Sequence, residues 1–162
     1  DSVRSGGPQS RAFDVRGVPG LDLPLIREGH VGALYQGVAT AHELDSRASG
    51  HEGLKGVWPG NILLRSGVRS RNMMYPDLGT FLRIDDLTST GKWFDLKTGS
   101  LTLKGHFFLS DGGSEPQYVG IQTIRTTFID LWSAIREIGN DQQRFGMVDV
   151  STWVVDGLDV KS

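Results

Sequence analysis

Glycine is the feature of this sequence that most limits its fold, because 22 glycines are spread along 162 residues without a repeating period. This is nearly twice the average usage of about 7%. The glycines, with prolines and Ser-Thr clusters, divide the chain into short apolar segments such as NILLRS, GTFLRIDDL and YVGIQTI. Segments of this kind are typical of β-strands. The sequence therefore predicts a mainly β fold of about eight short strands.

The clearest hairpin lies in FDLKTGSLTLKGHFFL, residues 94–109. Asp95 can accept hydrogen bonds from the turn backbone, and Gly99 can adopt the positive φ of a type I turn followed by a bulge. A second, interrupted strand is expected in VGALYQGVATAHEL, with a bulge at Gly37. Strands joined in this way favour an antiparallel barrel or sandwich.

One segment near the C-terminus has helical spacing instead. In TTFIDLWSAIREIGN the apolar residues recur every three or four positions. Thr127 can cap the first turn, Asp130 follows three residues later, and Gly139 provides a stop. We therefore predict one amphipathic helix of about three turns, packed on one end or one face of the strands.

The division into domains follows from composition. Residues 1–20 are rich in Gly, Ser and Arg and lack sustained periodicity, which predicts a flexible N-terminal arm. Residues 21–162 are then expected to form a single β-rich domain. No segment resembles a targeting signal or approaches the roughly 18 apolar residues of a membrane span. No membrane span is expected, and the sequence leaves the compartment open.

Several chemistries have no support in the sequence. The chain has no cysteine, which excludes disulfides, thiolate metal sites and thiol nucleophiles among these residues. The motifs of phosphate-binding loops, dinucleotide-binding folds, serine hydrolases and H-E-x-x-H zinc peptidases are also missing. The four histidines follow no established metal-ligand spacing. We therefore predict neither a metal nor a cofactor, and the sequence favours a non-enzymatic protein without deciding the point.

The stretch LLRSGVRSRN concentrates arginine in a chain whose formal net charge is only -2. Guanidinium groups that converge could bind phosphate or carboxylate through paired hydrogen bonds. The alternative is a solvated strand face whose arginines pair with nearby aspartates. If the arginines do converge, the expected function is a weak contact with a polyanion. The candidate anion-binding residues are Arg65, Arg69, Arg71 and Arg83.

A closed barrel would place polar side chains in a desolvated interior, where burial raises the pKa of a carboxyl group toward neutral pH. His106 and Asp149 are then the candidate acid and base. Trp93 and Trp153 could line the pocket, although tryptophans are also common core residues. This alternative function is a small β-barrel that binds an apolar ligand and cyclises or isomerises it.

The function that the sequence favours is a non-enzymatic β-domain that works by self-association or by docking of a partner protein. Missing catalytic motifs, a flexible arm and many strand edges that another chain could cover all point to a structural protein of a virion, fibre or scaffold. The predicted partner is a second copy of the chain or another protein. The sequence does not fix the partner, the ligand or the oligomeric state.

Overall fold

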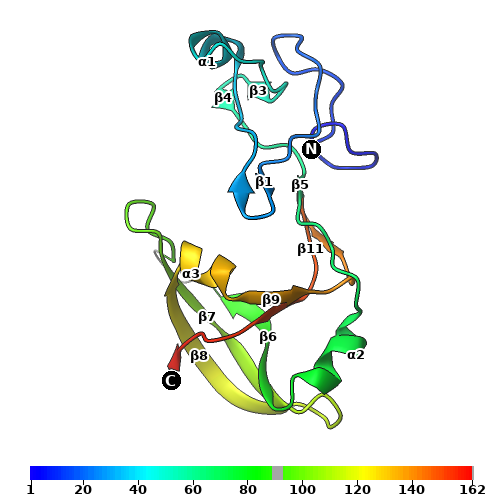
Figure 1. Ribbon diagram of the computed structural model, residues 1–162, viewed down its shortest axis with the longest axis vertical. Helices are drawn as coiled ribbons and strands as arrows, with labels where there is room; N and C mark the ends of the chain where they lie inside the picture. Colours follow the sequence, from blue (N-terminus) through cyan, green and yellow to red (C-terminus); the bar gives the residue numbers. More distant parts are fainter. Residues whose placement is uncertain (89–92, 162) are drawn as a thin grey trace. The chain divides into compact units, whose positions relative to one another are not determined.

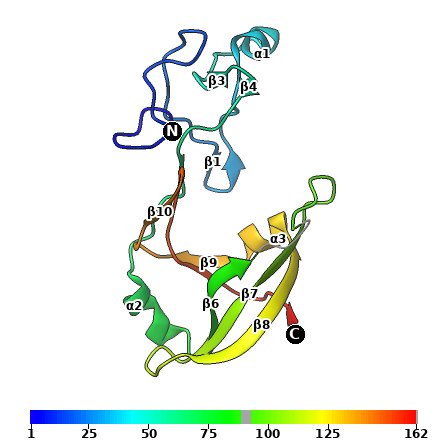
Figure 2. The same ribbon diagram turned by 180° about the vertical axis from the view of Figure 1, so that it is seen from behind.

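The computed structural model describes residues 1–88 and 93–161, and its contacts divide the chain into two compact units. Unit 1 consists of Asp1–Arg65 with Gln143–Val150, and unit 2 consists of Ser66–Gln142 with Ser151–Ser162. Figures 1 and 2 show the ribbon from opposite sides. The chain therefore passes from unit 1 to unit 2, returns to unit 1 for Gln143–Val150, and then enters unit 2 again.

Unit 1 is built from very short elements. Two antiparallel pairs, each with two residues per strand, are β1 (Ile26–Arg27) with β2 (His30–Val31) and β3 (Glu52–Gly53) with β4 (Gly56–Val57). The helix α1 (Val38–Glu43) begins after Gly37, and the Glu52 carboxylate accepts the backbone N–H of Val38 at 3.0 Å. The segment that we expected to bulge at Gly37 thus becomes a helix, because a distant carboxylate satisfies its first turn.

A three-stranded sheet joins the two sequence segments of unit 1. The strand β5 (Ile62–Leu63) runs parallel to β11 (Val148–Val150), which pairs antiparallel with β10 (Gln143–Phe145). The Ile62 amide donates to the Met147 carbonyl at 2.8 Å, and the Leu64 amide donates to the Asp149 carbonyl at 2.9 Å. Residues far apart in sequence therefore complete one sheet.

The interior of unit 1 is largely polar. All of its residues are described, and Ala41 is its one buried hydrophobic side chain. Its buried polar or charged residues are Ser2, Asp14, Ser49, His51, Asn61 and Asp149. Buried polar groups of this kind need hydrogen-bond partners, so directed bonds take the place of an apolar core here.

Unit 2 contains the long strands of the protein. An antiparallel sheet in the order β13-β8-β7-β6 is formed by β6 (Phe81–Thr88), β7 (Ser100–Ser110), β8 (Gln117–Thr127) and β13 (Val160–Lys161). Its register shifts between Ile84 and Asp86 and again between Phe107 and Phe108. Such bulges bend strands, and β7 and β8 are visibly curved in Figure 1.

The remaining elements of unit 2 are a second strand pair and three short helical segments. The strand β9 (Ile135–Ile138) pairs antiparallel with β12 (Trp153–Val155). The helical segments are α2 (Arg71–Met74), η1 (Tyr75–Asp77) and α3 (Phe128–Ser133). The buried hydrophobic side chains among the described residues of this unit are Met74, Leu101, Phe107, Ile124 and Val154. Burying one of the larger side chains contributes about 1.5–3 kcal/mol to the stability of the fold.

The predicted hairpin is confirmed. Gly99 has a φ of 69°, and its amide donates to the Asp95 carbonyl at 2.7 Å. The Asp95 carboxylate accepts the Lys97 amide at 2.9 Å, and Phe94 and Leu101 form an antiparallel bridge just beyond the turn. The turn therefore forms as predicted, whereas the described residues just before it make an isolated bridge rather than a regular strand.

The predicted late helix is only partly right. Its start is confirmed, because the Thr127 hydroxyl accepts the Asp130 amide at 3.1 Å. The helix α3 nevertheless ends at Ser133. The residues expected to continue it, Ile135–Ile138, form β9 and pair with β12. Strand pairing with a later segment overrides the helical pattern here.

The mainly β prediction is confirmed, with 13 short strands in five separate sheets and few helices in the described part of the chain. The largest sheet among residues 1–88 and 93–161 has four strands, and its two edge strands, β13 and β6, do not pair with each other. A closed barrel is therefore not found in the described part of the chain, and a sandwich is not confirmed there. The described helices are all too short for a membrane span.

The division into a flexible arm and a single domain stays a prediction. In the structure, residues 1–20 take part in hydrogen bonds of unit 1. The Ser2 amide donates to the Leu21 carbonyl at 3.3 Å, and the Val15 amide donates to the Glu52 carbonyl at 3.2 Å.

Candidate functional site

Unit 2 contains a cleft with a volume of about 450 Å³. It is lined by β6, by β12 with the residues that follow it, and by α2 with η1, while β7, β8 and β9 contribute single residues. Pockets for small organic ligands usually have volumes of about 300–1,000 Å³. The cleft is therefore large enough for one side chain or a small molecule.

The apolar part of the cleft comes from the core of unit 2. Phe107 is completely buried, and Ile124 and Val154 are also buried. Leu82 and Ile84, on the edge strand β6, line the cleft and remain partly exposed, Ile84 by 37%. The wall is thus continuous with the core, and its outer part is open to solvent.

Three arginines and two aspartates line the same cleft, and two of the arginines are paired. Arg83 lies 2.6 Å from an oxygen of Asp85 and sits over the Phe108 ring at 5.3 Å. Arg136 lies 3.6 Å from an oxygen of Asp156. These two ion pairs neutralise four of the five charges.

Arg71 is the remaining charge. Within residues 1–88 and 93–161, no hydrogen bond or ion pair is found for its guanidinium, and the side chain is exposed. Tyr75 lines the cleft one helical turn later, and its ring packs against Phe81 with centroids 4.9 Å apart. Burial raises the pKa of the Tyr75 hydroxyl, so this group stays protonated at neutral pH and can donate a hydrogen bond.

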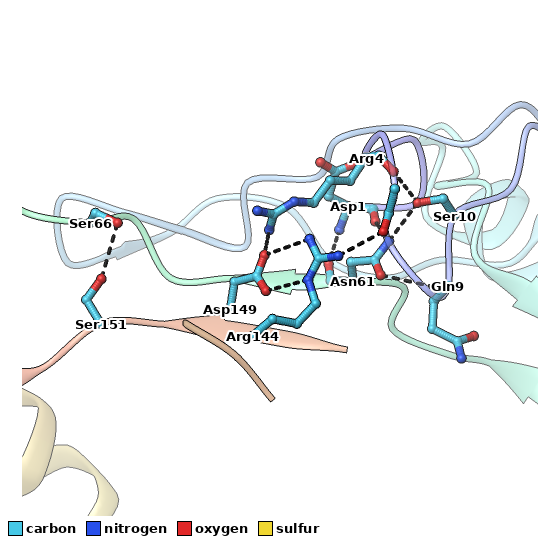
Figure 3. A network of polar contacts seen from close by, with 10 residues as sticks. Asp1, Arg4, Gln9, Ser10, Asn61, Ser66, Arg144, Asp149 and Ser151 are labelled. Atoms are coloured by element: carbon cyan, nitrogen blue, oxygen red, sulfur yellow. Dashed lines mark hydrogen bonds and ion pairs between the residues drawn. The ribbon is translucent and has the colours of Figure 1, made fainter. Parts of the chain in front are cut away.

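Unit 1 contains a buried carboxylate network, shown in Figure 3. Asp149 accepts hydrogen bonds from Arg144 Nε at 2.9 Å and Nη2 at 3.4 Å, and it also pairs with Arg4. Arg144 Nη1 donates to the Gly6 carbonyl at 2.8 Å. The hydrogen bond from Arg144 holds the pKa of Asp149 below its usual value. Asp149 therefore stays ionised at neutral pH and ties the first residues to the β10–β11 pair.

His51 is the second buried titratable group of unit 1. Its Nδ1 lies 2.6 Å from the Ser49 carbonyl, which can only accept, so Nδ1 carries the proton. The Tyr35 ring packs edge-on at 4.8 Å, and Nε2 is buried without a partner. Burial lowers the pKa of His51, so the ring is neutral at pH 7.

The four predicted anion-binding arginines have different surroundings. Arg71 and Arg83 both line the cleft of unit 2, whereas Arg65 belongs to unit 1. Arg69 bonds to Asp77 and, at 3.3 Å, to Glu137. A shared anion site stays a prediction, and two of its members already have carboxylate partners.

The predicted pocket and acid–base residues are also separated. Trp153 lines the cleft, whereas Trp93 packs beside Phe94 and is not among the lining residues. His106 lies on β7 with its Nδ1 3.0 Å from the Tyr118 hydroxyl, in unit 2. Asp149 belongs to unit 1 and is bonded to arginines. The acid–base pair stays a prediction that these contacts do not support.

Sequence reasoning missed most of the cleft. Tyr75, Phe81, Ile124 and Arg136 come from separate segments, so no local pattern marks them. One signal was present, because Arg71 and Tyr75 are four residues apart and share a face if the segment is helical. Reading this segment as a strand concealed that spacing.

The chain was compared with known families and structures. The sequence model of the family described as PmbA/TldA metallopeptidase C-terminal domain matches residues 1–162. Solved structures with the same fold include a candidate modulator of a DNA gyrase from Thermotoga maritima, with 21% identity and a TM-score of 0.84 over 97% of this chain. A candidate modulator of DNA gyrase from Bacteroides thetaiotaomicron has 15% identity and a TM-score of 0.76 over 96% of this chain. TldE from Thermococcus kodakarensis has 15% identity and a TM-score of 0.81 over 97% of this chain.

This chain covers only 37%, 34% and 38% of those three chains, respectively. It therefore corresponds to little more than a third of each relative. The comparison with curated proteins gives no match.

Proposed function

The chain belongs to the PmbA/TldA metallopeptidase C-terminal domain family, and from this premise we propose that it is the peptide-binding part of a metallopeptidase-type protein. Membership overturns the predicted structural or viral assembly module, which is wrong. The prediction inferred a non-enzymatic protein from the absence of catalytic motifs in this sequence. That inference fails because a domain of an enzyme can supply a binding surface without carrying the reactive groups. The apolar-ligand cyclase and the polyanion contact are set aside with it.

The observation that carries the proposal is the cleft of unit 2. It combines an apolar wall, whose outer residues Leu82 and Ile84 are open to solvent, with a few polar groups at its edge. Pockets that bind organic ligands generally combine a mostly apolar lining with a small number of orienting polar groups. A peptide side chain placed against Ile84 and Val154 would bury apolar surface on both partners.

The family description implies a metal, and the described residues of this chain do not fit one. Among residues 1–88 and 93–161 there is no group of three or more His, Cys, Asp or Glu side chains that could hold a metal ion. The sequence contains no cysteine, and the one buried histidine, His51, uses Nδ1 as a donor to a carbonyl. We therefore assign peptide binding to this chain and place any metal ligands in other residues of the longer proteins.

Peptide binding is tested by titrating the 162-residue chain with N-acetyl-Ala-Ala-Phe-amide and following tryptophan fluorescence, because Trp153 lines the cleft. We expect a saturable change. Ile84→Gln should weaken it at least about fivefold, since it replaces apolar wall by an amide. Ile121→Gln is the matched control, because Ile121 is 48% exposed and lies outside the cleft lining. A folded chain that shows no saturable change contradicts the proposal.

The predicted homo-oligomer or protein partner also remains a proposal. It is supported by large apolar side chains on unit 1 that are widely exposed, including Val31 by 74% and Leu54 by 94%. Covering such side chains with a partner surface would remove apolar area from water, which is favourable. Sedimentation velocity at micromolar concentration tests the homo-oligomer: a species heavier than 17.7 kDa is expected, and a pure monomer contradicts this form.

A further inference from the structure

The charges that line the cleft of unit 2 do not balance. Three arginines and two aspartates give 3 − 2 = +1. Since Arg83 is paired with Asp85 and Arg136 with Asp156, the excess positive charge belongs to Arg71. An unpaired guanidinium at the edge of an apolar cleft favours an anionic ligand group, because Arg binds carboxylates through two parallel hydrogen bonds.

A second donor accompanies this guanidinium. The Tyr75 amide donates to the Arg71 carbonyl, which is the i to i−4 hydrogen bond of a helical turn. Residues four apart in a helical turn lie on the same face, and both side chains line the cleft. For the Tyr75 hydroxyl, no hydrogen bond is found within the described part of the chain. The cleft edge therefore offers a cationic fork and a neutral hydroxyl donor side by side.

One carboxylate that interacts with Arg71 is already hydrogen-bonded. Asp141 interacts electrostatically with Arg71, but its oxygens accept the Thr152 amide at 3.1 Å and the Thr152 hydroxyl at 2.6 Å. Asp85 and Asp156 are held by the other two arginines. The guanidinium of Arg71 thus remains available to a ligand, while the neighbouring carboxylates would repel a second anion placed elsewhere in the cleft.

From this arrangement we propose that the cleft binds the C-terminal end of a peptide, with the terminal carboxylate on Arg71 and Tyr75 and an apolar last side chain against Leu82 and Ile84. This inference rests on the proposed peptide-binding function. It specifies which part of a peptide is recognised, since the cleft would distinguish a free C-terminus from an internal peptide segment. A carboxylate and an apolar side chain on the same residue match the polar edge and the apolar wall of a single 450 Å³ cleft.

The test compares two probes that differ only in the terminal group: N-acetyl-Ala-Ala-Phe as the free acid and as the amide. With the unmodified chain we expect the acid to bind at least about tenfold more tightly than the amide, and the preference to shrink at high salt. Arg71→Gln should remove the preference by weakening binding of the acid at least about tenfold. Tyr75→Phe should reduce it by a smaller factor, because the ring still packs on Phe81.

Two further variants keep the test decisive. Arg125→Gln removes an exposed arginine of β8 that does not line the cleft, so the acid preference should survive. Arg71→Lys retains the positive charge but cannot make two parallel hydrogen bonds to a carboxylate. It should therefore lower the preference for the acid without abolishing it. If Arg71→Gln does not fold, as judged by circular dichroism, the Arg71→Lys ratio serves instead.

The possible outcomes separate the two proposals. Equal binding of acid and amide to the unmodified chain overturns carboxylate recognition and leaves peptide binding intact. A preference for the acid that survives Arg71→Gln overturns the assignment to Arg71. If neither peptide binds, peptide binding itself fails, and the inference fails with it.

Discussion

The two units of this chain achieve stability by different means. Unit 2 buries apolar side chains such as Phe107 and Met74 completely, and its largest sheet includes strands of 8 and 11 residues. Unit 1 has strands of two or three residues, and it buries Asp149 and His51 where a core would hold Leu or Phe. Apolar burial is non-directional and insensitive to pH, whereas a polar interior depends on each partner being present and correctly ionised.

The difference shows why a cleft with an apolar wall occurs in unit 2. A ligand pocket needs a wall that keeps its shape when solvent enters, and the eight-residue strand β6, paired along its length with β7, supplies one. Unit 1 is held largely by hydrogen bonds and ion pairs among very short strands and loops. The two units should therefore respond differently to truncation, to acid and to the loss of a single hydrogen bond.

The largest effect is expected from Phe107→Ala in unit 2. Removing a completely buried ring leaves a cavity and should lower the free energy of unfolding by about 3–5 kcal/mol. Guanidinium unfolding followed by tryptophan fluorescence measures the loss. Ile121→Ala, on a half-exposed side chain of the same sheet, should cost much less. Equal losses for the two variants would contradict the view that unit 2 has an apolar core.

The next effect is expected from Asp149→Asn in unit 1. The substitution leaves Arg4 and Arg144 without their carboxylate in a buried position. Hydrogen exchange read by mass spectrometry should become about tenfold faster or more in residues 1–7 and 143–150, with little change in β7 and β8. Equal acceleration in both units would show that unit 1 is not held locally by this network.

A smaller effect is expected from Thr127→Ala, which removes the N-cap of α3. The Thr127 hydroxyl accepts the Asp130 amide, and loss of such a cap costs about 1 kcal/mol. Thermal unfolding measured by circular dichroism reports the loss. Thr127→Ser, which keeps the oxygen, is the matched control and should restore most of the stability.

The smallest expected effect is a pH dependence confined to unit 1. Burial lowers the pKa of His51, while nearby Arg11 lowers it further and Asp14 opposes this. Because the folded-state pKa lies below the unfolded value of about 6.5, stability is fully present above pH 6.5 and falls as the pH decreases below it. Hydrogen exchange of unit 1 should therefore accelerate from pH 7.5 to 5.5 after correction for intrinsic rates. His51→Gln should remove this change, and an unchanged profile in that variant would assign it to another group.

Local features of the fold could be predicted from the sequence, and long-range ones could not. The turn at Asp95 and Gly99 was predictable because its chemistry lies within five residues. The start of α3 was predictable for the same reason. Its end was not, because β9 forms only by pairing with β12, which lies about fifteen residues further along the chain. The helix α1 was missed because its first amide is satisfied by Glu52, outside the segment.

The cleft shows the same limit. Arg71, Arg83 and Trp153 were singled out from the sequence for other reasons, and the structure places all three in one cleft lining. The sequence could not show that the cleft joins segments from residue 71 to residue 160. Nor could it show which arginines carry carboxylate partners, since the Arg69 contact with Glu137 spans 68 positions.

The parallel pairing of Val148 with Ile62 has a consequence for how the protein is made. During synthesis, β5 leaves the ribosome long before β11, so the sheet of unit 1 has to wait until Val148–Val150 has been translated. Non-local pairing of this kind is slow because a long loop must close first. Meanwhile the β6–β7–β8 meander can form from residues that emerge in sequence. A nascent chain arrested before residue 143 should therefore contain a folded meander and a protease-sensitive N-terminal half.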